Sequence, residues 1–77
     1  MDKGFGSERY RKLIGLLVEQ RRALGYSQAQ LAARLGTHQQ FVSRYETGER
    51  RLDVAEFCEV AAVLQLDAIE LLKCTGV

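Results

Sequence analysis

The sequence predicts a single all-α domain of five short helices. Glycines and capping residues divide the 77 residues into short segments, and apolar residues within these segments recur every three or four positions. No segment shows the alternation typical of a strand. A chain of this length can build one core but not two. We therefore expect a flexible leader over residues 1–8, a domain over 9–73 and a tail over 74–77.

The first predicted helix is capped by Ser7 and runs to Leu24. Gly25 ends it, because glycine readily takes the left-handed conformation that closes a helix. Helical spacing places five apolar residues on one face, namely Tyr10, Leu13, Ile14, Leu17 and Leu24.

The next two helices follow each other closely. Ser27–Gln30 forms a capping box, and the helix behind it ends at Leu35 before Gly36. A second capping box, Thr37–Gln40, predicts a third helix that runs to about Thr47. Two capped helices with one glycine-containing turn between them make a helix-turn-helix unit, whose second helix can enter a DNA major groove about 12 Å wide.

Two more helices complete the predicted domain. The fourth follows the charged turn Glu49–Arg51. Its expected buried face consists of Val54, Phe57, Ala61 and Leu64. Asp67 caps a short fifth helix. This last helix carries Ile69, Leu71 and Leu72.

The run from Gln28 to Gly48 resembles the helix-turn-helix core of lambdoid phage repressors, of the Cro and C1 type, and of XRE-like bacterial transcriptional regulators. Six residues fall at the spacing of that family: Gln28, Ala32, Gly36, Val42, Glu46 and Gly48. The resemblance covers about Leu13 to Leu72 and implies a five-helix lambda-repressor-like domain that binds double-stranded DNA and regulates transcription. The chain departs from the family at Leu52–Asp53, where many relatives begin the fourth helix with a proline.

The expected recognition helix spans about residues 38–47. Gln39 and Gln40 occupy its first turn, and Arg44 lies about one turn further on. A glutamine amide can pair with adenine, and an arginine can bind guanine or a phosphate. The resemblance implies base contacts at these three positions, whereas mere solvation of an exposed helix is the alternative.

Phosphate contacts are expected beside this helix. Gln28 stands at the start of the second helix, where free N–H groups attract a phosphate, and the resemblance implies a phosphate contact for it. Ser43, Arg50 and Arg51 are further candidates. The other arginines of this half, Arg9, Arg11 and Arg34, are better explained as ordinary surface residues that add long-range attraction.

Four further residues need interpretation. Two of them have alternative roles, and the other two have a structural one. His38 can touch a phosphate or base edge, or remain solvated, and Phe41 can meet a thymine methyl or pack against the fourth helix. Arg21 and Glu46 resemble a family ion pair that joins the first helix to the third. We therefore expect Glu46 to be structural rather than catalytic.

Charge divides the chain into two parts. Residues 9–51 hold nine basic and three acidic side chains, whereas residues 52–77 hold one basic and five acidic ones. This division suggests that the first part meets a polyanion, although solvated helix faces of different sign are the alternative. The acidic, apolar last third is the expected homodimer interface, with Leu66, Ile69, Leu72 and Val77 as candidates.

Other functions find little support in the sequence. One histidine and two widely spaced cysteines leave too few ligands for zinc, and no nucleophile, carboxylate pair or phosphate loop has the spacing of an enzyme. No cofactor, small-molecule ligand or membrane contact is expected. We expect the protein to be cytoplasmic. Cys58 is better explained as a small semi-buried hydrophobe than as a redox switch.

The main rival to a DNA-binding regulator is an antitoxin-like or adaptor protein that uses the same fold to bind a protein partner. The length of the chain suits a phage repressor, a restriction–modification controller or a short antitoxin equally. An adaptor would show little salt-dependent affinity for DNA, which distinguishes it from a regulator.

Overall fold

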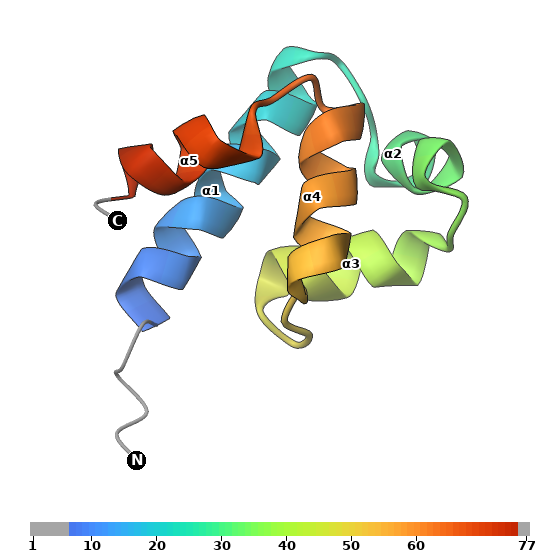
Figure 1. Ribbon diagram of the computed structural model, residues 1–77. Coiled ribbons are helices and arrows are strands. Elements are labelled where there is room, and N and C mark those ends of the chain that lie inside the picture. Colours follow the sequence, from blue (N-terminus) through green and yellow to red (C-terminus); the bar gives the residue numbers. More distant parts are fainter. Residues whose placement is uncertain (1–6, 76–77) are drawn as a thin grey trace.

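The structure, a computed structural model, describes residues 7–75. These residues contain five helices. Their bounds are Ser7–Ala23 for α1, Gln28–Leu35 for α2, Gln39–Thr47 for α3, Val54–Val63 for α4 and Ala68–Cys74 for α5. In Figure 1, α1 and α5 lie to the left of α4 and α2 lies to its right, while α3 runs across the lower end of α4. The predicted all-α fold with a helix-turn-helix at its second and third helices is confirmed.

The ends of the helical region differ slightly from the predicted limits of the domain. Ser7 is itself the first residue of α1, and Cys74 is the last residue of α5. Thr75 follows as a buried residue. The rest of the predicted leader, residues 1–6, and the last two residues, 76–77, lie outside the described residues.

The start of α2 has the predicted capping box, but the start of α3 does not. Ser27 Oγ accepts the Gln30 N–H at 3.0 Å, and Gln30 Oε1 accepts the Ser27 N–H at 2.8 Å. The capping box expected at Thr37 is wrong, because the Thr37 N–H donates to the Ala32 carbonyl at 2.9 Å and so closes the end of α2. His38 therefore becomes the N-cap of α3, and its side chain makes no cap hydrogen bond within residues 7–75.

The carboxylate of Asp53 caps the start of α4. Asp53 Oδ1 accepts the Glu56 N–H at 2.7 Å, and Glu56 Oε1 accepts the Asp53 N–H at 3.0 Å. The predicted burial of Val54 is wrong, since this first residue of α4 is 80 % exposed. Val60, which was not among the residues expected on the buried face, is buried in the core.

The core fixes the orientation of α3. Its side chains come from all five helices: Ile14, Leu17, Leu31, Ala32, Val42, Tyr45, Phe57, Val60, Ala61, Leu64 and Leu71. Val42 and Tyr45 of α3 are completely buried. The opposite stripe of α3, which carries Gln40, Arg44 and Thr47, is exposed.

Candidate nucleic-acid interface

The exposed side of α3 carries the residues expected to read bases. Gln39 and Gln40 are its first two residues, and both are exposed. Arg44 lies four residues after Gln40 and is exposed as well. Its Nε is 3.8 Å from a carboxylate oxygen of the exposed Glu49, a surface contact of little energetic weight. The guanidinium of Arg44 is therefore free to reorient toward a ligand.

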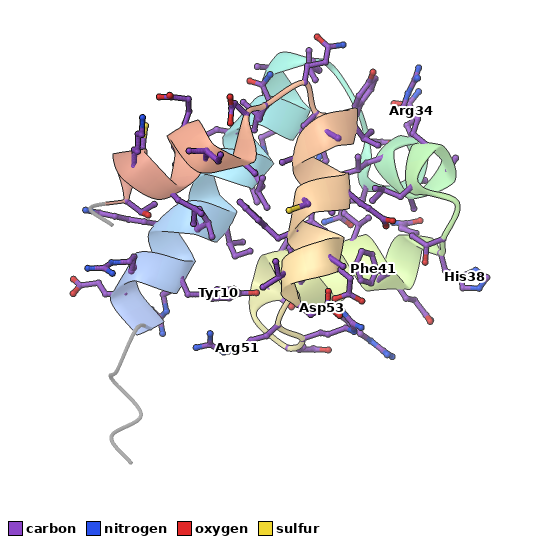
Figure 2. All side chains as sticks on the ribbon, in the orientation of Figure 1. Tyr10, Arg34, His38, Phe41, Arg51 and Asp53 are labelled. Carbon is purple, nitrogen blue, oxygen red and sulfur yellow. The ribbon has the colours of Figure 1, made fainter. Side chains whose placement is uncertain are left out.

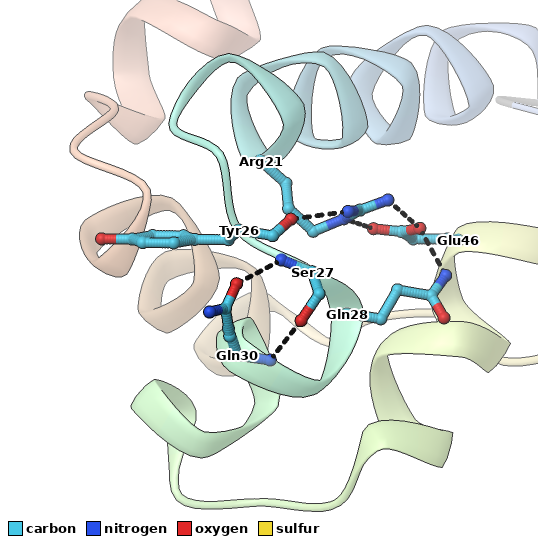
Figure 3. A network of polar contacts seen from close by, with 6 residues as sticks. All are labelled: Arg21, Tyr26, Ser27, Gln28, Gln30 and Glu46. Atoms are coloured by element: carbon cyan, nitrogen blue, oxygen red, sulfur yellow. Dashed lines mark hydrogen bonds and ion pairs between the residues drawn. The ribbon is translucent and has the colours of Figure 1, made fainter.

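A buried polar network fixes α3 against α1 (Figure 3). Arg21 donates from Nε to Glu46 Oε2 at 2.7 Å and from Nη2 to Glu46 Oε1 at 3.1 Å. Its Nη1 donates to the carbonyl oxygen of Tyr26 at 2.8 Å. The Arg21 and Glu46 side chains are 10 % and 8 % exposed. The structure thus brings together the two residues that the family resemblance paired, and Glu46 acts as a structural anchor.

Gln28 joins the same network at the start of α2. Its Nε2 donates to Glu46 Oε1 at 2.9 Å, a contact that the sequence analysis missed. A side-chain amide has two N–H donors, so the second remains for another acceptor. Gln28 therefore links α2 to α3 and keeps one N–H for a further acceptor at the start of α2.

The two arginines of the α3–α4 turn have different surroundings. Arg50 donates from Nη1 and Nη2 to the two oxygens of Glu56, at 2.8 Å and 2.7 Å, and its guanidinium lies over the Phe41 ring, 4.9 Å from the centroid. Hydrogen bonds from Arg50 lower the pKa of the Glu56 carboxyl to about 2. The guanidinium of Arg51 instead lies 4.3 Å from the centroid of the Tyr10 ring on α1.

The other three residues predicted to contact DNA differ in how exposed their side chains are. Phe41 is half-buried and meets Tyr45 edge to face, with ring centroids 5.6 Å apart. It therefore packs partly against the hydrophobic core. His38 is exposed at the α2–α3 turn and points away from the body of the protein (Figure 2), and Ser43 is half-buried.

One buried group was missed by the sequence analysis. The hydroxyl of Tyr45 is inaccessible and has no hydrogen-bond partner among the described residues. Burial, followed by the nearby charge of Glu46, raises the pKa of this hydroxyl well above its ordinary value. The apolar spacing of α3 predicts the burial of Tyr45 but says nothing of its oxygen.

Two helices joined by a glycine-containing turn, with an exposed polar face on the second, have the arrangement of a helix-turn-helix unit. In agreement, the helix-turn-helix family model of the XRE type matches residues 17–71. The chain belongs to this family of DNA-binding regulators. No curated protein matched it. Among the described residues, no helix is long and apolar enough to cross a membrane, and no group of three or more histidine, cysteine or acidic side chains could hold a metal ion.

Proposed function

We propose that this protein regulates transcription by reading a specific duplex sequence with α3 in the major groove. Gln39, Gln40 and Arg44 are the base-reading residues. The observation that carries this proposal is their joint exposure on one face of a helix whose opposite face is fixed by the core and by Glu46. A rigid helix can place amide and guanidinium donors reproducibly against base edges, which is what discrimination between sequences requires.

Phosphate contacts on either side of α3 complete the proposed interface. The second N–H of Gln28 and the backbone N–H groups at the start of α2 face one phosphate. Ser43 and the exposed His38 are auxiliary donors, and Arg51 binds the backbone beyond the other end of α3. Arg50 is excluded from this set because Glu56 already binds both of its terminal nitrogens.

We further propose that two copies pair through α5. Ile69 is 65 % exposed and Leu72 is 38 % exposed, and these neighbouring apolar side chains lie three residues apart on one helix. Leu66 is half-buried beside the core, and the fourth candidate, Val77, lies outside the described residues. A two-fold dimer would place two recognition helices about 34 Å apart, so the operator would be an inverted repeat.

A mobility-shift experiment with DNA from upstream of the protein's own gene tests the regulatory role. We expect a discrete complex that survives an excess of unrelated duplex and weakens steeply as salt rises. Equal competition by specific and unrelated DNA would remove the sequence-reading role. Absence of any complex at low salt would favour the adaptor.

Sedimentation at micromolar concentration tests the dimer. The wild type should sediment as a dimer, and Ile69→Asp should become a monomer with unchanged helical circular dichroism. Val54→Asp is the matched control, since Val54 is also apolar and exposed but lies on α4. A wild type that remains monomeric both free and on DNA would contradict the dimer.

A further inference from the structure

An open groove of about 700 Å³ separates the first turns of α1 from the end of α3. Tyr10, Arg11 and Gly15 line it from α1, Thr47 and Gly48 from the end of α3, and Arg51 from the following turn. The family model begins its match at residue 17. The α1 residues named here therefore lie before the family-matched segment, and the helix-turn-helix assignment gives them no role.

The groove continues the reading face of α3. Thr47 follows Arg44 by three residues and Gln40 by seven, which places all three on one side of the helix. Thr47 also lines the groove. A duplex that lies along Gln40 and Arg44 would consequently bring its sugar–phosphate backbone to the mouth of the groove.

Two exposed arginines stand on opposite walls of the groove. Arg11 comes from α1, and Arg51 comes from the α3–α4 turn. Neither forms an ion pair with another described residue. Glu46 is the acidic residue of the lining, but Arg21 and Gln28 both donate to its carboxylate. Its negative charge is therefore balanced within the protein.

The wall around Arg51 is held in place. The Tyr10 hydroxyl accepts the Leu52 N–H at 2.9 Å, which ties α1 to the turn after α3. Figure 2 shows Tyr10 reaching from α1 toward that turn, with Arg51 beside it. The ring then supports the guanidinium face of Arg51 at 4.3 Å, while the N–H edges of a stacked guanidinium remain able to bind an anion.

We infer that this groove receives the phosphodiester backbone of the DNA that flanks the bases read by α3. Arg11 and Arg51 bind phosphate oxygens from its two walls. This inference rests on the proposed function and extends it to the part of α1 before the family match. A backbone suits the groove because the groove is open, carries arginine on both sides and adjoins the reading face. Each arginine should therefore contribute one phosphate contact to the affinity and to its salt dependence.

The first test compares Arg11→Gln with Lys12→Gln. The two residues are adjacent and exposed on α1, and each change removes one positive charge, but Lys12 does not line the groove. Fluorescence anisotropy with an unrelated duplex of about 30 base pairs, roughly three turns, measures Kd as a function of salt. Arg11→Gln should weaken binding about tenfold and reduce the slope of log K against log salt by about 0.9.

Lys12→Gln should change Kd by about twofold or less, because a screened distant charge contributes little. Equal effects of the two substitutions on Kd and slope would overturn the groove assignment while leaving the proposed function intact. A wild type that binds neither this duplex nor the upstream DNA would instead defeat the proposed function, and with it the basis of the inference.

The second test introduces a side chain into the groove and leaves both arginines unchanged. A Cβ atom at Gly15 would meet no atom within 4 Å, so Gly15→Ala adds its side chain without a clash and Gly15→Glu can begin its side chain there. Gly15→Ala should bind DNA as the wild type does. Gly15→Glu should bind about tenfold more weakly, because it places a carboxylate where the phosphate would lie. Thermal melts would verify that both variants fold, and equal affinities of the two folded variants would overturn the inference.

Discussion

Two arginine–glutamate pairs of nearly equal geometry stand at opposite sides of α3. Arg21 and Glu46 approach to 2.7 Å, and so do Arg50 and Glu56. Each arginine makes two hydrogen bonds to its carboxylate. Their surroundings differ, since the first pair is 10 % and 8 % exposed and the second is 43 % and 26 % exposed.

This difference separates the residues that hold the domain together from those at its surface. The buried pair joins α1 to α3 across 25 positions of sequence, whereas the exposed pair joins a turn to the first turn of the adjacent helix. Water screens the charges of the exposed pair. The charges of the buried pair are not screened in this way, so each depends on the other for compensation. Contact distance alone would rank the two pairs equally, so burial is what distinguishes their contributions to stability.

Removing one partner of the buried pair should have the largest effect. Arg21→Met leaves the Glu46 carboxylate buried without its counter-charge and with two hydrogen bonds fewer, and Glu46→Gln leaves the Arg21 guanidinium buried without its counter-charge. We expect each to lower the free energy of unfolding by about 3 kcal/mol. Urea titration followed by circular dichroism measures this loss, which is a large part of the stability of so small a domain.

The double variant Arg21→Met with Glu46→Gln tests whether the two losses share one cause. Because no buried charge is left alone, it should be less destabilised than the sum of the single variants. Small, strictly additive losses would show that the pair contributes no more than an exposed one.

Substitution of the reading glutamines should affect binding rather than folding. Gln39→Ala and Gln40→Ala remove exposed side chains, so the unfolding transition should stay within about 0.5 kcal/mol of the wild type. Each should weaken binding to the cognate site by about 1 to 3 kcal/mol and leave unrelated DNA nearly unaffected. Titrations on both duplexes provide the comparison, and equal losses on both would remove the base-reading role.

Much of this organisation could be predicted from local sequence. The glycines that end α1, α2 and α3 all take positive φ, as expected for Gly25, Gly36 and Gly48. The Ser27–Gln30 capping box is a local motif, and it too is present as predicted. Gln39 and Gln40 are exposed at the start of α3, as expected for the recognition helix. These features depend on a few neighbouring residues, which is why a sequence reveals them.

The features that were missed depend on competition between neighbours or on distant contacts. Thr37 was assigned to α3, but its N–H is used to close α2. The helical pattern could not show that Val54, three residues before the buried Phe57, is exposed. Arg50 and Arg51 are adjacent basic residues in the sequence, and the fold alone directs one toward α4 and the other toward α1.

Those two arginines give the next prediction. Arg51→Ala should weaken binding to all DNA sequences alike and lower the salt slope by about one, because it removes a phosphate contact. Arg50→Ala removes the same charge from the same turn, but its guanidinium is bound to Glu56. It should therefore change the slope by well under half as much. Salt titrations of both variants decide the matter, and a larger effect of Arg50→Ala would reverse the assignment.

The smallest effect is expected from titration of the exposed pair. Two hydrogen bonds from Arg50, followed by the Asp53 N–H, lower the pKa of Glu56 from its ordinary 4.5 to about 2. A lowered carboxyl pKa stabilises the folded state above pH 4.5, and this contribution is lost as pH falls from 4.5 toward 2. In an NMR titration of the side-chain carboxyl carbon, Glu56 should therefore titrate near pH 2 in the wild type. In Arg50→Gln its midpoint should rise toward 4.5 but stay below it, because the Asp53 N–H still donates to Glu56. A wild-type midpoint near 4.5 would show that water separates the pair in solution, and the contrast with the buried Arg21–Glu46 pair would then extend to geometry as well as burial.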